Sequence, residues 1–198
     1  METLVIRFKC LMKGEICCFF KNYEEMPVVF PWEKKKLEEL SSLIDENLVF
    51  KPYIVYSAED KNIVVLYKWI INGLCPFLKN NKCSIHEYKP LACQMYPLLV
   101  GWDDNTLRVS LECPWIKDNI NKVKRLDPAK VFEKEYNVAV RVFLILKIIE
   151  EYARRNNWVK RVIGKWDEID NYVEITDVLE NIADLWEKLE VRGRVNDQ

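Results

Sequence analysis

All seven cysteines of this 198-residue chain lie in its first 113 residues. A scattered buried cysteine usually packs as a small hydrophobic side chain, but the confinement of the whole set to one part of the chain indicates a shared role. Disulfides are an alternative, and the odd count would leave at least one thiol unpaired. We interpret the set as thiolate ligands of a metal centre. The candidate ligands are Cys10, Cys17, Cys18, Cys75, Cys83, Cys93 and Cys113.

The segment from Cys75 to Pro97 holds three of these cysteines at close spacing. Asn80 and Asn81 are turn-forming residues between the first two cysteines. Pro90 is suited to open a short helix that would carry Cys93. We therefore expect this segment to curl the three thiols around one point.

Two of the cysteines, Cys75 and Cys113, are each followed by proline. Proline pushes the residue before it into an extended conformation. A Cys-Pro pair also stands at one end of a ferredoxin ligand run. Both pairs favour a ligand role over simple packing.

Cys17 and Cys18 are neighbours in a segment, Ile16–Phe20, that we predict to be a strand. Successive strand side chains point to opposite faces, so these thiols are not expected to bind one centre together. Two alternatives stay open: one thiol is a ligand while the other packs inward, or the two serve separate sites. His86, the only histidine, could be a ligand or an acid–base group, but ordinary loop hydrogen bonding is favoured.

The spacing of the cysteines bears on the identity of the metal. Structural zinc sites usually contain tight Cys-x₂₋₄-Cys knuckles, and this chain has none. Iron–sulfur clusters tolerate more irregular spacing and need four cysteines. We therefore favour an iron–sulfur cluster of the [4Fe–4S] type over zinc, with Cys75, Cys83 and Cys93 as the first ligands.

The motifs Cys75-Pro-Phe-Leu, Cys83-Ser-Ile-His-Glu-Tyr-Lys-Pro and Cys93-Gln-Met-Tyr-Pro resemble the YkgJ-type cysteine-cluster family, whose domain is described as chelating zinc or iron. The match spans Cys10 to Cys113. The flagellin lysine N-methylases look like relatives of that family. This resemblance implies a second possible function, a protein-lysine N-methyltransferase that uses S-adenosylmethionine and acts on a protein substrate. A third is a zinc-stapled, non-catalytic module that binds a protein partner.

The chain departs from the family pattern at its first cluster. The family has Cys-x-x-Cys-x-x-Cys-Cys, whereas in this chain six residues separate Cys10 from the Cys17-Cys18 pair, so the second cysteine is missing. His86 replaces a tyrosine, Lys89 an arginine and Trp115 a glycine. Eight cysteines could build two four-ligand sites but seven cannot, so one complete site is the simpler expectation.

The apolar patterning predicts an α+β fold, with short strands and hairpins around the cysteines and a mainly helical C-terminal part. We expect a cysteine-bearing part over 1–114 and a helical extension over 115–198, packed as one unit. Two helices are expected at Trp32–Asp45 and from Asp127 to about Arg155, and an amphipathic one from near Thr176. The expected strands are Leu4–Phe8, Ile16–Phe20, Tyr53–Ser57, Ile63–Trp69, Leu98–Trp102 and Leu107–Leu111.

The charge balance excludes one class of partner. Thirty basic and thirty-one acidic residues give a net charge of −1, so nothing indicates a nucleic-acid surface. No stretch resembles a signal peptide or a membrane span, and we expect a cytoplasmic protein without membrane contact. Abundant Lys, Glu, Ile and Val with two glutamines, Gln94 and Gln198, resemble the composition of heat-adapted proteins. The sequence does not indicate the oligomeric state.

Overall fold

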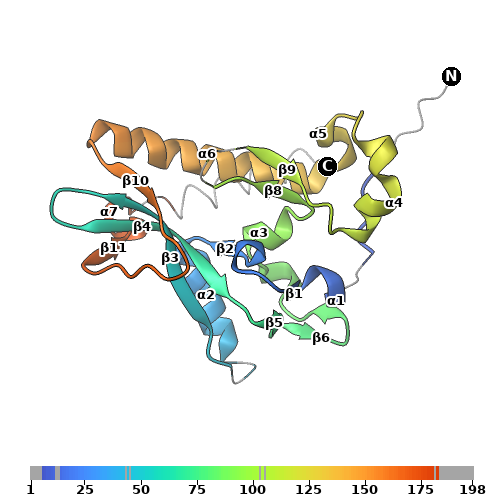
Figure 1. Cartoon of the computed structure of the whole chain (residues 1–198), viewed down its shortest axis with the longest axis horizontal. Helices are drawn as coiled ribbons and strands as arrows, with labels where there is room; N and C mark the ends of the chain where they lie inside the picture. Colours follow the sequence, from blue (N-terminus) through green and yellow to red (C-terminus); the bar gives the residue numbers. More distant parts are fainter. Residues whose placement is uncertain are drawn as a thin grey trace.

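The computed structural model describes residues 6–11, 14–42, 44, 46–102, 104, 106–180 and 182. Within these residues the chain forms the α+β fold expected from the sequence (Figure 1). Its helices are α1 (Gly14–Cys17), α2 (Pro31–Ser41), α3 (Leu91–Gln94), α4 (Pro114–Val123), α5 (Pro128–Val131), α6 (Glu133–Arg155) and α7 (Ile175–Val178). Its strands are β1 (Phe19–Phe20), β2 (Val28–Val29), β3 (Val49–Ser57), β4 (Asn62–Ile70), β5 (Gly73–Leu74), β6 (Leu78–Lys79), β7 (Lys82–Cys83), β8 (Leu98–Val100), β9 (Leu107–Val109), β10 (Val159–Val162) and β11 (Tyr172–Glu174).

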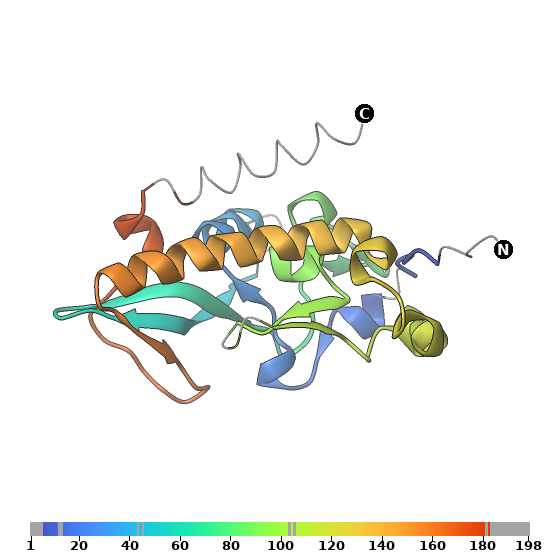
Figure 2. The ribbon, with the colours of Figure 1, turned by 90° about the horizontal axis from the view of Figure 1, so that it is seen from above.

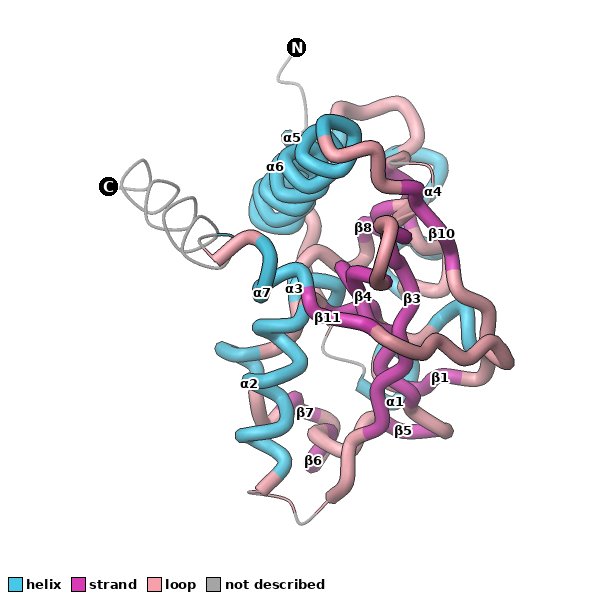
Figure 3. The backbone as a smooth tube through the Cα atoms, turned by 90° about the vertical axis from the view of Figure 1, so that its left-hand side faces the viewer, coloured by secondary structure: helices cyan, strands magenta, loops and turns pink. Residues whose placement is uncertain are grey.

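The main sheet is built on the β3–β4 hairpin, whose strands contain the predicted strands Tyr53–Ser57 and Ile63–Trp69. β10 pairs with the free edge of β3 in antiparallel orientation. Two strands pair with the free edge of β4. Near the start of β4, β11 pairs with it in parallel orientation, and near the end of β4, β2 pairs with it in antiparallel orientation. Figure 3 shows these strands crossing the middle of the molecule. The predicted β8–β9 hairpin forms a separate two-stranded sheet.

Both faces of this sheet are covered, so β4 is buried along most of its length. One face packs against α6, with Ile63 and Val65 in the same core cluster as Val142 and Ile149. The other face carries Val64 and packs against α2 and the cysteine-bearing loops. Alternating strand residues point to opposite faces, which explains why neighbouring valines of β4 enter different clusters. Figure 2 shows α6 running along the sheet.

The helix expected from Asp127 to Arg155 is interrupted. Asp127 caps α5, where its carboxylate accepts the Ala129 N–H at 3.0 Å, as the sequence predicts. The chain leaves helical geometry at Phe132 (φ −117°, ψ 46°) and then begins α6. The Phe132 ring is buried, with its centroid 5.5 Å from that of Phe8 and 6.1 Å from that of Trp115. This aromatic packing accounts for a break that no glycine or proline marks in the sequence.

The predicted strand Ile16–Phe20 is wrong for its first half. Gly14 to Cys17 form the single turn of α1, in which the Cys18 N–H donates to the Gly14 carbonyl at 2.8 Å, and only Phe19–Phe20 pair as a strand. Tertiary context overrides β propensity readily in so short a segment. Residues 6–8 of the predicted strand Leu4–Phe8 have no strand pairing, and residues 4 and 5 lie outside the described part.

The part after Cys113 is helical with two additions. β10 and β11 return to the main sheet, although the sequence analysis placed no strand there. The V-K-R-V sequence of β10 lacks the apolar alternation by which a half-buried strand is recognised. The helix predicted from near Thr176 begins at Ile175, and its continuation beyond Ile182 falls outside the described residues.

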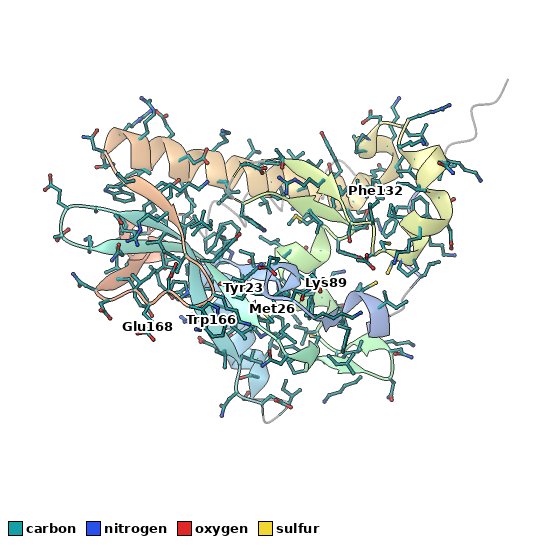
Figure 4. All side chains as sticks on the ribbon, in the orientation of Figure 1. Tyr23, Met26, Lys89, Phe132, Trp166 and Glu168 are labelled. Carbon is teal, nitrogen blue, oxygen red and sulfur yellow. The ribbon has the colours of Figure 1, made fainter. Side chains whose placement is uncertain are left out.

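One lysine anchors the segment that follows β1. Lys68 of β4 is 4% exposed, and its amine donates to the carbonyls of Glu24 (3.0 Å) and Met26 (2.8 Å). The amine also lies over the Tyr53 ring, 5.0 Å from its centroid. Burial lowers the pKa of Lys68 to about 8. Tyr23 and Met26 lie together near the centre of Figure 4, which shows where this anchor ties the N-terminal segment to the sheet.

Candidate metal centre

A tight hairpin brings Cys75 and Cys83 together. Leu78 of β6 pairs with Cys83 of β7, and the Leu78 N–H donates to the Cys75 carbonyl at 2.9 Å. Asn80 and Asn81 make the turn with φ angles of 49° and 60°. Asparagine tolerates this left-handed region better than most residues. The turn predicted from these two asparagines is therefore confirmed.

The N-terminal segment adds Cys18 to this hairpin. β1 and β5 pair in antiparallel orientation, with Phe19 opposite Leu74. The next rung joins the two cysteines directly, since the Cys75 N–H donates to the Cys18 carbonyl at 2.8 Å. Two residues 57 positions apart in the sequence are thus held in register by a backbone hydrogen bond.

Cys93 reaches the same region on α3, the short helix that begins after Pro90, as predicted. The N-terminus of α3 is held by a carboxylate from another helix. Glu33 of α2 accepts the Leu91 N–H at 2.6 Å and, through its other oxygen, the Phe30 N–H at 2.9 Å. A carboxylate at this position satisfies a helix N–H that has no partner within the helix. α2 therefore fixes the position of the helix that carries Cys93.

Cys18, Cys75, Cys83 and Cys93 form what we call the first cysteine group. Burial is the largest cause of the raised pKa of the Cys93 thiol, and the nearby thiols of Cys75, Cys18 and Cys83 raise this pKa further. Burial likewise raises the pKa of Cys75 to about 12, with contributions from Cys18 and Cys83. Like charges raise a thiol pKa only when they lie close. Four thiols from three segments are therefore neighbours.

Some neighbours of this group act against the effect of burial and favour thiolates. The backbone N–H groups of Phe77 and Leu78 interact with the Cys75 sulfur and lower its pKa, against the larger effect of burial. The Lys89 ammonium lowers the pKa of both Cys18 and Cys93. Figure 4 labels Lys89 below α3, on the side of α1. Soft sulfur donors with nearby N–H groups are the usual setting of a thiolate-bound metal.

We call the remaining cysteines, Cys10, Cys17 and Cys113, the second cysteine group, although Cys10 also helps raise the pKa of Cys18. After burial, the strongest influence that raises the pKa of Cys17 is Cys113, followed by Cys10 and then its covalent neighbour Cys18. Cys113 in turn is influenced by Cys10. The structure thus places the Cys17 and Cys18 thiols in different surroundings. The strand alternation from which we expected this is wrong, because Cys17 is the last residue of helix α1.

Several expectations can be judged directly. None of the seven cysteines, all within the described residues, is disulfide-bonded. His86 lies exposed in the 3₁₀ turn His86–Tyr88. Among the described residues, no three or more His, Cys, Asp or Glu side chains are spaced, as they stand, to hold one metal ion.

Two residues that shape the site were missed in the sequence. Glu33 stands three residues after Phe30, where a carboxylate commonly accepts a hydrogen bond from the residue that precedes a helix. Its second hydrogen bond, to the Leu91 N–H, cannot be predicted from the residues around Glu33. Gly14 is buried because α1 approaches the β6–β7 hairpin closely. A Cβ there would overlap the Leu78 side chain and lie 3.2 Å from the Asn81 carbonyl oxygen.

None of the helices in the described part has the length and apolar character needed to cross a membrane. No curated protein and no solved structure shows significant similarity to the chain. One family model matches residues 9–115, more than half of the chain and all seven cysteines. Its description is "putative zinc- or iron-chelating domain". The chain thus belongs to the CxxCxxCC family of cysteine-cluster domains, as the motifs between Cys75 and Pro97 predicted.

Proposed function

We propose that this protein carries a [4Fe–4S] cluster bound by Cys18, Cys75, Cys83 and Cys93. The observation that supports the proposal is the first cysteine group itself, in which a hairpin, the β1 segment and α3 contribute thiols to one place. Four cysteine thiolates are the complete ligand set of such a cluster. Cys18 thereby becomes the fourth ligand, ahead of Cys17 and Cys113.

The spacing of the cysteines along the sequence favours a cluster over one zinc ion. A tetrahedral zinc site draws four sulfurs around a single atom, whereas a cluster distributes its ligands over several iron atoms. The absence of a tight Cys-x₂₋₄-Cys knuckle from the sequence supports iron–sulfur chemistry.

When bound, such a cluster supplies one-electron transfer or Lewis acidity. The chain's own residues would hold and tune it. Backbone N–H groups of Phe77 and Leu78 would stabilise charge on the Cys75 sulfur, and Lys89 would offset the negative charge of four thiolates. Hydrogen bonds to the sulfurs and net charge are two features that set a cluster's reduction potential.

Metal analysis of the full chain purified without oxygen tests this proposal. We expect iron and sulfide in equal amounts and a broad visible absorbance. The Cys93→Ser variant should lose that absorbance. The His86→Ala variant is the matched control from the same loop, and it should retain the cluster because His86 is exposed. Zinc without iron, or no metal in the unmodified chain, would contradict the proposal.

The two alternatives stay predictions. Zinc bound without iron would support the zinc-stapled interaction module. The S-adenosylmethionine-dependent lysine methyltransferase and its protein substrate follow only from the resemblance, and five glycines leave little room for a glycine-rich nucleotide loop. Calorimetry with cluster-loaded protein and S-adenosylmethionine tests that activity directly.

A further inference from the structure

An apolar stripe runs along the outer side of α6. Val140, Leu144 and Ile148 stand four residues apart and are 37%, 46% and 41% exposed. Residues at this spacing are neighbours on one face of a helix, so the stripe is about 12 Å long. Leu144 stands two residues from both Val142 and Leu146, which are buried, and it therefore points away from the sheet. Contiguous apolar surface of this kind marks a place that another element covers.

The last described residues bring the chain to the edge of this stripe. Figures 1 and 2 show α7 beside the C-terminal half of α6. Ile182 is 3% exposed and lies in the same core cluster as Ile145 and Ile149 of α6. Ile145 stands one turn before Ile148, so the stripe adjoins this cluster. The chain thus continues from a buried position near one end of the stripe.

The backbone at Ile182 has entered a new helical turn. α7 ends at Leu179, whose φ of −118° and ψ of 77° are not helical. Ile182 is helical again, and its N–H donates to the Leu179 carbonyl at 2.9 Å. A short helix draws most of its stability from the packing of an apolar face. Any helix that continues from Ile182 therefore needs an apolar surface beside it.

The sixteen residues after Ile182 lie outside the described part, but their sequence has the pattern of an amphipathic helix. Leu185, Trp186 and Leu189 stand three, four and seven residues after Ile182, which is the spacing of one helix face. Charged residues fill most of the positions between them, and Gly193 is suited to end a helix. A helix of about eleven residues from Ile182 would be about 16 Å long, which is enough to cover the stripe.

We propose that residues 183–192 form a helix whose apolar face, centred on Trp186, packs against the Val140–Leu144–Ile148 stripe of α6. Because α7 lies beside the C-terminal half of α6, the added helix runs back towards the N-terminal half, antiparallel to α6. A segment of the same chain is favoured over a second molecule, since covalent attachment gives it a high effective concentration. The proposal involves no cysteine, so it stands or falls independently of the metal centre.

Photo-crosslinking in the full chain tests the contact. With p-benzoylphenylalanine in place of Trp186, irradiation should join the side chain to α6 within one molecule, and peptide mass spectrometry should locate the bond between residues 137 and 152. The same probe in place of Asp184, on the other side of the expected helix, is the matched control and should give several-fold less of this product. Bonds between two molecules, bonds to other elements, or equal yields at the two positions would overturn the proposal.

A double-mutant cycle measures the coupling between the two surfaces. Leu144→Ser and Trp186→Ser should each raise the unfolding equilibrium constant about tenfold, because each removes buried apolar area. The double variant should show less than the product of the two effects, since either change alone breaks the same contact. Leu99 of β8 is 40% exposed and provides the control, because Leu99→Ser should act independently of Trp186→Ser. Independent effects of Leu144→Ser and Trp186→Ser would overturn the contact.

Discussion

The Glu33 carboxylate accepts the backbone N–H of Leu91 at 2.6 Å and so links α2 to the helix that carries Cys93. Its other oxygen accepts the Phe30 N–H at 2.9 Å, at the start of α2 itself. One side chain therefore provides hydrogen-bond acceptors for backbone N–H groups at the start of two helices that are far apart in the sequence. The position of a candidate ligand depends on this residue, although Glu33 lies outside both cysteine groups.

Replacing Glu33 with alanine should destabilise the fold and loosen α3. Two part-buried N–H groups would lose their acceptor, which costs about 1–3 kcal/mol. Denaturant unfolding of the full chain measures the change. Glu39→Ala is the control on the same helix, because Glu39 is exposed and makes only a surface ion pair with Lys36 at 3.2 Å. That change should stay within about 0.5 kcal/mol, and equal effects of the two variants would contradict the linking role.

Glu33 should also make stability depend on pH. Burial raises its pKa from 4.5 to about 7, although the Phe30 and Leu91 N–H groups act in the opposite direction. Because the folded-state pKa lies above the unfolded one, the folded state holds the proton more tightly. The contribution of Glu33 to the unfolding free energy therefore falls as pH rises from about 4.5 to about 7, and it is constant above that.

The comparison with Glu33→Gln isolates this effect. Glutamine does not titrate, so the difference in unfolding free energy between the unmodified chain and the variant should decrease by about 3 kcal/mol across that pH range. Thiol titrations contribute equally to both proteins and cancel in the difference. A difference that stays constant from pH 4.5 to 7 would contradict the raised pKa.

Gly14→Ala should separate α1 from the β6–β7 hairpin. The added methyl would overlap the Leu78 side chain and crowd the Asn81 carbonyl oxygen at 3.2 Å. Overpacking of this kind costs about 1–3 kcal/mol, and it would move Cys17 and Cys18 away from their partners. We expect lower stability together with lower iron content after reconstitution.

A double-mutant cycle checks the cause. Leu78→Ala removes the side chain that the new methyl would meet, so Gly14→Ala should cost less in that background than in the unmodified chain. Additive effects of the two substitutions would mean that Gly14 is required for another reason. The remaining contact with the Asn81 backbone should keep the rescue incomplete.

Removal of bound metal should loosen the cysteine loops and leave the main sheet folded. The core between β3, β4 and α6 contains no cysteine, and most of its side chains come from these three elements, although Leu91 and Met95 of the α3 segment also pack into it. Hydrogen exchange after chelation should therefore rise over residues 73–97 while these three elements stay protected. Loss of protection throughout the described chain would instead identify the metal as a staple for the whole fold.

Local signals in the sequence predicted much of this fold. The β3–β4 and β8–β9 hairpins, the start of α2 at Pro31, the Asp127 cap and the turn at Asn80 and Asn81 all follow from residues that lie within or beside the element. The failures have a common origin. α1, the break at Phe132 and strand β10 depend on contacts with distant segments, such as Phe8 against Phe132 and Val159 against Ser57.

The sequence by itself determined the family and the α+β class. It also predicted the association of Cys75, Cys83 and Cys93, because these three share one short segment with its own turn and helix signals. Only the tertiary structure decided which other cysteine joins them. Cys18 is held to Cys75 by a hydrogen bond across the β1–β5 pair, whereas Cys17, at the end of α1, lies with Cys113 and Tyr96. Adjacent residues take different partners because Cys18 is held by pairing with a distant strand, whereas Cys17 belongs to the helical turn of α1.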